Sequence, residues 1–460
     1  MRYAFALAAP HSGAGKTTVT LAVLAALRRR GWTVQSFKVG PDYIDPAHHA
    51  CLTGRPGRNL DTWMLPPEEN RRIFEAAGAD ADVGVVEGVM GLFDGIDGRR
   101  PEGSTAHLAR MLDLPVVLVV DARSMARSAA ALVRGFATFD PGLRLAGVIW
   151  NRVGSATHRR ILDDALQASS SLPGLGAVPR DEAVALPERH LGLVTPEDAG
   201  LPRDLAARLA DLAEAHLDLD ALLEGARRHP SGPPPLRAAP PTGAPARIGV
   251  ARDAAYCFYY EDNLELLSAL GAELVFFRPT DGDGIPPDLG GLYLGGGYPE
   301  VHGAALSRNR PFLEGLRALH ERGVPIYAEC GGLMTLCRHL EEPDGTRRPM
   351  AGVLPTAAHM RRRGFRLGYR EVRVQGAPGL DGLTARGHEF HYSDIDPMPS
   401  SVRRLYRVRN ARGEALPDEG YALGRTLASY VHLHFGSNPE LPRRWFDLPG
   451  QAAGGPGPSR

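Results

Sequence analysis

The feature that most constrains the fold is a glycine-rich turn between an apolar strand and a helix. Residues 4–8 are apolar and predict a buried strand, and residues 17–30 predict a helix. The turn between them reads APHSGAGKTT, and its glycines Gly13 and Gly15 let backbone N–H groups point at one centre. A strand, turn and helix in this order are typical of a parallel sheet covered by helices, so we predict a doubly wound α/β domain.

The same turn carries the side chains of a phosphate-binding loop. Its amides and the N-terminus of the following helix are expected to hold the phosphate oxygens of ATP. Lys16 is placed to reach the β- and γ-phosphates, and the hydroxyl of Thr17, which Thr18 follows, is placed to bind Mg²⁺. Pro10 stands where the motif usually has its first glycine, and an ordinary glycine-rich turn is the alternative. Because strand, loop and helix agree, the sequence favours nucleotide binding.

Two later strands lead to polar residues that face the same edge of the predicted sheet. Glu87 follows the strand at 83–86, and Asn151 lies just past the strand at 145–149. Ligands of open α/β sheets bind at the carboxyl ends of the strands, so Glu87 is a second expected Mg²⁺ ligand and Asn151 is expected at the adenine edge. The alternative for Glu87 is a helix-capping or solvated carboxylate. The remaining elements of this half are strands at 34–39 and 116–120 and helices at 106–112, 126–138, 158–168 and 205–228.

The loop after the strand at 34–39 gathers a lysine, two acids and an aromatic residue. These are Lys38, Asp42, Tyr43 and Asp45, in a segment that two prolines make rigid. We expect Lys38 to contact the nucleotide, Asp45 to join the Mg²⁺ ligands, and Asp42, Tyr43 and Asp45 to contact the substrate. A proline-rich surface turn is the alternative, but such a turn needs no lysine beside two aspartates.

Composition excludes several classes of protein. Lys+Arg and Asp+Glu are both 53, so net charge gives no argument for a nucleic-acid or membrane-surface partner. No apolar run is long enough to span a bilayer, and residues 3–9 predict a buried strand rather than a signal peptide. The four cysteines form no C-x-x-C pair, which argues against a disulfide framework and a zinc site and favours a cytoplasmic location.

A proline-rich segment divides the chain in two. Residues 227–246 contain PPP and PP and predict an extended linker between a synthetase domain at 1–226 and a second α/β domain at 247–447. Residues 448–460 predict a disordered tail that is rich in glycine and proline. The second domain is expected to contain strands at 248–251, 274–277, 292–294 and 326–328 and helices at 261–270 and 311–322.

Cys330 lies at the tip of a turn between a strand and a helix. The sequence IYAECGGL is typical of a nucleophile elbow, in which the helix N-terminus is expected to lower the thiol pKa. The N–H of Gly331 is one expected oxyanion donor, and the loop with Gly296 and Gly297 is expected to supply the second. A small buried core residue is the alternative for a lone cysteine, but a tight turn fits that alternative poorly.

A thiolate nucleophile needs a base, and a late strand carries two histidines. The spacing of His432 and His434 places both on one face of that strand, and one of them is expected to reach Cys330, although the spacing does not decide which. The segment HEFHY at 388–392 suggests a metal cluster, but no further ligands accompany it, so we interpret it as structural or substrate-lining. Arginines at 361–363, 366, 370 and 373 predict either a solvated edge or a clamp for several carboxylates.

Short motifs along nearly the whole chain match, in order, those of one family. They are SGAGKTT, KVGPDYIDP, EGVMGLFDG, PERHLGL, GGGYPE, ECGG, HEFHY and YVHLHF. With these motifs the chain resembles the cobyrinate a,c-diamide synthases and the closely similar hydrogenobyrinate a,c-diamide synthases. The N-terminal half is also similar to dethiobiotin synthetases. The string GPDYIDP is specific.

The resemblance implies an ATP–Mg²⁺ synthetase domain followed by a triad-type glutaminase domain. It assigns the base to His432, and no third, acidic triad member is evident. The implied partners are ATP, L-glutamine and a cobyrinate-type corrinoid, with hydrogenobyrinate or Ni-sirohydrochlorin as alternative substrates and a homodimer left open. Two other functions are alternatives: a P-loop ATPase switch with an inactive glutaminase-like domain, and a plain carboxylate–ATP enzyme, which needs no second domain.

Overall fold

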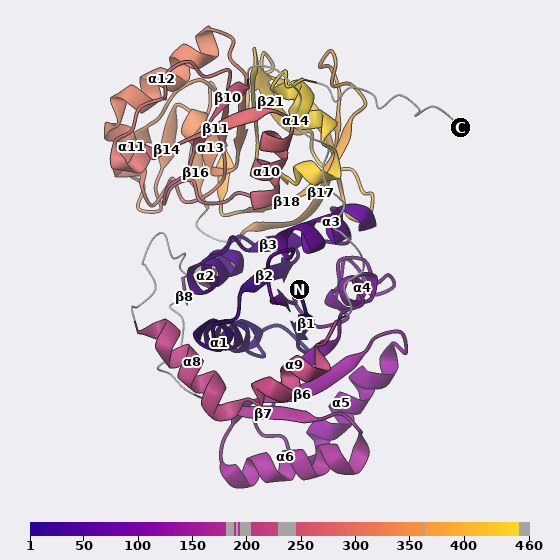
Figure 1. Ribbon diagram of the computed structural model, residues 1–460. Coiled ribbons are helices and arrows are strands. Elements are labelled where there is room, and N and C mark those ends of the chain that lie inside the picture. Colours follow the sequence, from indigo (N-terminus) through magenta and orange to yellow (C-terminus); the bar gives the residue numbers. More distant parts are fainter. Residues whose placement is uncertain (181–187, 190–191, 194–203, 229–244, 362–363, 450–460) are drawn as a thin grey trace, which may run out of the picture. The chain divides into compact units, whose positions relative to one another are not determined.

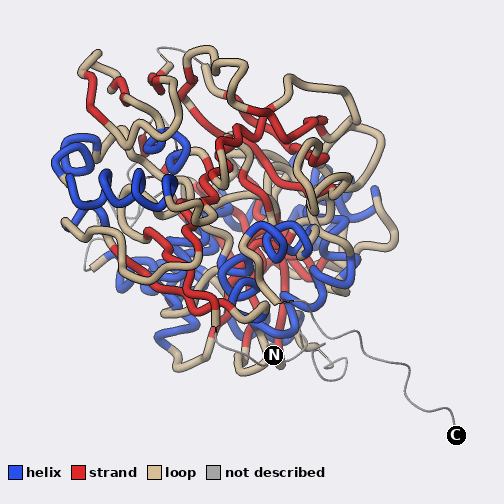
Figure 2. Tube along the Cα trace, turned by 90° about the horizontal axis from the view of Figure 1, so that it is seen from above, coloured by secondary structure: helices blue, strands red, loops and turns tan. Residues whose placement is uncertain are grey.

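The computed structural model describes residues 1–180, 188–189, 192–193, 204–228, 245–361 and 364–449. The chain forms two compact units, Met1–Leu236 and Arg237–Arg460 (Figure 1). Most of the predicted linker and tail, residues 229–244 and 450–460, and the arginines at 362–363 lie outside the described residues. The alternation of helices and strands along each unit can be followed in Figure 2.

The first unit is built on a seven-stranded sheet in the order β3-β2-β4-β1-β5-β6-β7, in which every pair is parallel. The central strands are buried on both faces, which is why their sequences are apolar without alternation. Helices α1, α8 and α9 pack on one face, and α4 lies on the other side of β1 (Figure 1). The strands are β1 (Tyr3–Ala8), β2 (Val34–Val39), β3 (Arg58–Leu60), β4 (Val83–Glu87), β5 (Val116–Asp121), β6 (Leu145–Val153) and β7 (Gly174–Pro179), followed by the short pair β8 (Glu188–Arg189) and β9 (Gly192–Leu193).

The helices of this unit follow the strands as a doubly wound fold requires. Helix α1 has no acidic residue in its first turn, and its last turn carries Arg28 and Arg29, which suit the negative end of the helix dipole. Helices α4 and α6 are capped by Ser104 and Ser155, whose side chains accept from backbone N–H groups of their first turns. The helices are α1 (Lys16–Arg29), α2 (Ile44–Thr53), α3 (Pro67–Ala77), α4 (Thr105–Met111), α5 (Arg127–Phe139), α6 (Ala156–Ser169), α8 (Leu205–His216) and α9 (Leu219–Gly225).

The second unit contains a ten-stranded mixed sheet in the order β11-β10-β12-β13-β22-β21-β20-β17-β18-β23. Strands β11 to β22 in this order are parallel, and the antiparallel part begins at β21. The strands are β10 (Ala246–Ala251), β11 (Ala272–Phe277), β12 (Gly291–Leu294), β13 (Ile326–Glu329), β17 (Arg366–Val374), β18 (Thr384–His391), β20 (Arg403–Asn410), β21 (Glu419–Leu423), β22 (Thr426–Ser429) and β23 (His432–Leu433).

Smaller elements complete the second unit. A four-stranded sheet has the order β15-β14-β16-β19. The apolar residues of the large sheet and of helices α10 and α12 form one buried core. The elements are β14 (His339–Glu341), β15 (Arg347–Pro349), β16 (Ala357–Met360), β19 (Ser393–Ile395), α10 (Glu261–Ala269), α11 (Gly303–Arg308), α12 (Arg310–Glu321), α13 (Gly331–Leu336), α14 (Glu440–Trp445) and the 3₁₀ turns η2 (Pro279–Asp281) and η3 (Phe435–Ser437).

The structure corrects several sequence-based expectations. Asn151 lies inside β6 rather than beyond it, because that strand runs on to Val153. Asp45 lies in helix α2 and not in a loop. Arg228, which the sequence predicted to lie in the linker, donates its backbone N–H to the carbonyl of Arg2 at 2.9 Å. The first unit therefore extends beyond residue 226. Apart from the strand that carries His432, the antiparallel half of the second sheet had no predicted strands. Among the described residues, no helix is long and apolar enough to cross a bilayer.

Candidate functional site

The phosphate loop is held in place from strand β6. Gly13 and Gly15 have φ of 78° and 93°, which favour glycine. A Cβ at Gly15 would lie 2.1 Å from Nδ2 of Asn151, and that amide donates to the carbonyl of Ala14 at 2.8 Å. Arg152 Nη1 donates to the carbonyl of Gly13 at 2.8 Å. Asn151 therefore supports the loop, and its expected contact with adenine stays a prediction.

The two polar side chains at the start of α1 point to different partners. Lys16 is 8% exposed, and its Nζ donates to the carbonyl of Met90 at 2.5 Å. Burial, with a further effect of the Lys38 charge, lowers the pKa of Lys16 to about 8. The hydroxyl of Thr17 donates to Glu87 Oε1 at 2.7 Å and lies 3.5 Å from Asp45 Oδ2. The predicted metal-binding residues thus come together.

Lys38 lies at the centre of this acidic cluster. Its ammonium forms an ion pair with Asp45, another with Glu87 at 2.9 Å and a third with Asp42 at 3.8 Å. Burial works against charge on Lys38, but the three carboxylates hold its pKa above the usual range. Burial likewise opposes charge on Glu87, yet the Lys38 ammonium holds its pKa well below normal. Burial, with repulsion by Asp42 and Glu87, raises the pKa of Asp45.

A histidine that the sequence analysis missed completes the cluster. His49 is fully buried, and its Nε2 lies 2.7 Å from Glu87 Oε2. The available signal was spacing, because Asp45 and His49 are four residues apart on α2 and so share one face of the helix. Asp42 Oδ1 accepts from the N–H groups of Ile44 and Asp45 at 2.9 and 3.1 Å and fixes the start of that helix. Tyr43 precedes the helix and is half-buried, and its contact with substrate stays a prediction.

The donor set suits Mg²⁺ bound together with a nucleotide. One hydroxyl and two carboxylates are hard oxygen ligands, and Mg²⁺ in such sites takes few protein ligands and keeps several waters. Among the described residues, no group of three or more His, Cys, Asp or Glu is arranged to hold a metal by itself. Thr17, Asp45 and Glu87 therefore fit a metal that phosphates help to hold.

Cys330 occupies the turn predicted for it. Strand β13 ends at Glu329 and α13 begins at Gly331, and Cys330 between them has a φ of 46°, which is rare for a residue with a side chain. Its N–H donates to the carbonyl of Ser429 at 2.8 Å, and its carbonyl accepts from Met334 N at 3.0 Å. These two bonds hold the strained backbone in place.

The expected lowering of the Cys330 pKa was wrong. The residue is 6% exposed, and burial, with a further effect of Glu300, raises the pKa of the thiol well above its usual range. The hydrogen bond from Gly331 N–H acts in the opposite direction but is the smaller effect. The thiol therefore needs a base to ionise.

The predicted oxyanion donors lie next to each other. A Cβ at Gly331 would lie 3.2 Å from the backbone N of Gly297, so the two backbones are in close approach. Gly297 has a φ of 151°, and a Cβ there would lie 2.2 Å from the carbonyl of Ala255. Its N–H has no acceptor among the described residues. The role of Gly297 and Gly331 as oxyanion donors stays a prediction, which the close approach of the two backbones supports.

His432 borders the same loop. A Cβ at Gly296 would lie 2.4 Å from His432 Cε1 and 3.3 Å from its Nε2. The imidazole is 1% exposed and stacks on His388, its partner on β18, with 5.0 Å between ring centroids. Burial, then the charge of His391, lowers the pKa of His432 to about 3, so the ring is neutral.

His434 has a different environment from His432. Its ring packs on Tyr260 at 4.6 Å between centroids, and its Nδ1 accepts from the N–H of Gly436 at 3.2 Å, capping η3. The assignment of His432 as the base stays a prediction, which its closeness to Gly296 supports.

The HEFHY segment is an internally paired cluster. His391 Nε2 lies 2.7 Å from Glu389 Oε1, and Arg370 Nε donates to Glu389 Oε2 at 2.6 Å. Burial opposes charge on Glu389, but these two partners lower its pKa to about 2. Arg370 therefore has a structural ion pair instead of forming a solvated edge, whereas Arg366 is exposed.

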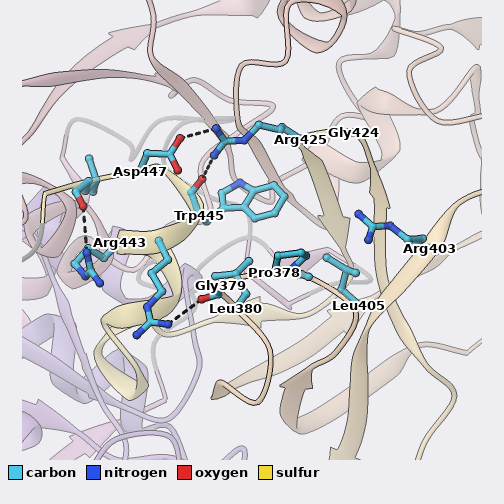
Figure 3. A pocket seen from close by; sticks show the side chains of 13 residues that line it. Pro378, Gly379, Leu380, Arg403, Leu405, Gly424, Arg425, Arg443, Trp445 and Asp447 are labelled. Carbon is cyan, nitrogen blue, oxygen red and sulfur yellow. Dashed lines mark hydrogen bonds and ion pairs between the residues drawn. The ribbon is translucent and has the colours of Figure 1, made fainter.

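A cavity of about 610 Å³ in the second unit lies away from Cys330 (Figure 3). It adjoins Gly424 and Arg425, which precede β22, whereas Cys330 follows the opposite, carboxyl end of the neighbouring strand β13. Figure 3 shows Arg425 paired with Asp447 beside Trp445. Its four arginines bond mainly to carboxylates and carbonyls of α14 and adjacent loops. The cavity contains none of the predicted site residues.

Comparisons with known proteins agree with this arrangement. Residues 5–194 match the CobQ/CobB/MinD/ParA nucleotide binding domain, and residues 247–440 match the CobB/CobQ-like glutamine amidotransferase domain. A cobyrinate a,c-diamide synthase from Syntrophotalea carbinolica is 48% identical over 96% of this chain and 97% of its own length. The chain belongs to the cobyrinate a,c-diamide synthase family. Family members of the same name from Gloeobacter violaceus and Salmonella typhimurium are 46% and 44% identical, each over 96% of this chain and 96% and 97% of their own lengths.

Membership of the cobyrinate a,c-diamide synthase family confirms the resemblance drawn from the motifs. It also confirms the predicted fold class, a nucleotide-binding parallel α/β domain followed by an α/β glutamine amidotransferase domain. The protein is a glutamine-dependent, amide-forming ligase.

Proposed function

We propose that this chain uses ATP and glutamine to amidate the a and c acetate carboxylates of cobyrinate, a step of corrin biosynthesis. The observation that carries the proposal is that one chain holds two sets of reactive groups: a phosphate loop beside an acidic cluster, and a cysteine elbow beside a buried histidine. The name shared by relatives that align over almost the full length supports the choice of substrate.

The glutaminase step follows from the groups around Cys330. His432 takes the thiol proton, and the sulfur forms a bond to the amide carbon of glutamine. The oxygen of that carbon becomes an oxyanion, which the N–H groups of Gly297 and Gly331 bind. His432 then returns the proton to the leaving nitrogen, the C–N bond breaks, and ammonia departs. Water hydrolyses the remaining thioester to glutamate and restores the thiol.

The synthetase step follows from the groups around the phosphate loop. A free carboxylate is a poor electrophile, so an acetate oxygen of the substrate attacks the γ-phosphorus of ATP, giving ADP and an acyl phosphate. Lys16 and the loop amides bind the phosphates. Ammonia then attacks the acyl carbon, and phosphate leaves as the amide forms. Two such cycles amidate the two carboxylates.

Mg²⁺ is the expected companion of ATP, and we propose that Thr17, Asp45 and Glu87 hold it. When bound, it would offset the negative charge that builds up on the transferred phosphoryl group. His49 orients Glu87. Lys38 holds Asp45 and Glu87 close together through its ion pairs before the nucleotide arrives, and it is itself a proposed nucleotide contact.

The test is the variant Cys330→Ala, assayed with cobyrinate, ATP and either glutamine or ammonium. Glutamine-dependent amidation is expected to disappear while ammonium-dependent amidation persists, because only the first needs the thiol. Loss of both activities in a folded variant would contradict the proposal that Cys330 serves only the glutaminase step. Parallel assays with hydrogenobyrinate and nickel sirohydrochlorin identify the substrate, and preference for either would replace cobyrinate in the proposal.

A further inference from the structure

The residue before the nucleophile, Glu329, places its carboxylate beneath the glutaminase site. Its side chain is 1% exposed. Oε1 accepts hydrogen bonds from the hydroxyl of Tyr327 and the N–H of Leu433, and Oε2 accepts one from the hydroxyl of Tyr293, each at 2.9 Å. These donors come from the three strands β12, β13 and β23, so the carboxylate is fixed from several sides.

The fixed carboxylate faces one nitrogen of His432. Oε2 of Glu329 lies 3.8 Å from Nδ1 of His432. The Cε1–Nε2 edge of the ring faces Gly296, in the loop that adjoins Gly331. A histidine that serves a nucleophile through Nε2 needs an acceptor at Nδ1, because that contact fixes the tautomer and stabilises the imidazolium. The two edges of His432 are oriented in this way.

We propose that Glu329 is the acidic positioning residue that the sequence motifs left unassigned. The inference rests on the proposed roles of Cys330 and His432. When the thiol proton moves to Nε2 of His432, the Nδ1–H donates to Glu329, and this contact holds the ring until the proton passes to the leaving ammonia. A separation of 3.8 Å is long for a hydrogen bond, and such contacts in unliganded enzymes tighten when the substrate binds.

Two other acids near the site, Glu389 and Glu419, are engaged by different partners. Glu389 is bonded to His391 and Arg370. Glu419 accepts from the hydroxyl of Ser429 at 2.6 Å and from the N–H of Tyr430 at 2.8 Å. Glu329, in contrast, accepts bonds from two neutral hydroxyls and one amide, and among the described residues its one cationic partner would be a protonated His432.

The surroundings of Glu329 predict a pH dependence near neutrality. Burial raises its pKa to about 7, and the three hydrogen bonds act against that shift. Its ionised form is therefore expected to appear as pH rises through 7, and glutamine hydrolysis should rise with it. The titratable groups facing it are Tyr259, Tyr293, Tyr327, Tyr406, Cys330 and His432.

The experiment measures glutamine hydrolysis by the full chain, without any acceptor acid, as a function of pH. We expect Glu329→Gln to lower kcat about 100-fold, with little change in KM, and to abolish the acidic limb of the profile. Glu329→Asp should recover part of the loss. The control is Glu273→Gln, an exposed acid on β11 of the same unit, which should match the parent.

A second variant keeps the test decisive if Glu329→Gln does not fold. Tyr293→Phe removes a hydrogen bond that lowers the pKa of Glu329, so it should move the acidic limb to higher pH. An unchanged kcat and limb in Glu329→Gln would overturn the inference, as would an unmoved limb in Tyr293→Phe. Ammonium-dependent amidation of cobyrinate reports separately on the proposed function: its absence in the parent chain would refute that function and leave the hydrolysis result valid.

Discussion

Replacement of Gly296 by alanine should disable the glutaminase by displacing one side chain. The added Cβ would lie 2.4 Å from Cε1 of His432, whereas non-bonded carbons approach to about 3.5 Å, so the two groups must separate by about 1 Å. The packing around the His432 ring opposes this movement. It is 1% exposed and stacked on His388, and its backbone pairs with the same residue.

The size of this displacement gives the expected loss in catalytic rate. A misplacement of about 1 Å at a catalytic group costs roughly 100-fold in rate, or ~3 kcal/mol of transition-state stabilisation. Glutamine-dependent amidation by Gly296→Ala should fall by about that factor. Ammonium-dependent amidation should be unchanged, because the phosphate loop belongs to the other unit.

The assay compares both activities in the parent, in Gly296→Ala and in a matched control. Gly290 lies just before β12 in the same unit, and a Cβ there would lie 3.7 Å from its nearest neighbour, which is ordinary contact. Gly290→Ala should therefore behave as the parent does. If Gly296→Ala hydrolyses glutamine at the parent rate, the assignment of His432 as the base is refuted, since its ring would tolerate displacement.

Four further results are expected. Gly387→Ala would place a Cβ 1.9 Å from the carbonyl oxygen of His432, so it should separate β18 from β23. Both the glutaminase activity and the melting temperature should fall, and Gly290→Ala is again the control. Lys38→Met removes the cation among three carboxylates and should cost about 3–5 kcal/mol in urea unfolding; an unchanged midpoint would contradict the buried ion pairs. His49→Gln should weaken MgATP binding in calorimetry while glutamine hydrolysis stays normal, and equal affinity would remove His49 from the site. Between pH 4.5 and 7 folded Glu329 keeps a proton that the unfolded chain has lost, so its contribution to the free energy of unfolding falls as pH rises. Glu329→Gln should therefore reduce the change in the free energy of unfolding between pH 5 and pH 8, measured by urea unfolding. An equal change in the parent and the variant would contradict the raised pKa.

The local sequence predicted those strands and turns whose residues follow one another directly in the chain. Strands that are buried on both faces, such as β5 at Val116–Asp121, were predicted to within one residue because a parallel sheet needs continuous apolar runs. The turn at Cys330 was also predicted, because a strand, a nucleophile and two glycines follow one another directly. The antiparallel strands β17 to β21 were not predicted, since they are rich in arginine and partly exposed.

The sequence by itself determined the fold class, the phosphate loop, the nucleophile and the family, because each depends on residues adjacent in the chain. The tertiary structure decided which distant side chains meet. It brought together His49 and Glu87, Asn151 and Ala14, and Leu433 and Glu329, contacts that span 38, 137 and 104 residues. It also reversed the expected pKa shift of Cys330, because burial depends on everything packed around the thiol. Contacts between residues far apart in the chain, and the loss of water around them, are products of folding that no local pattern encodes.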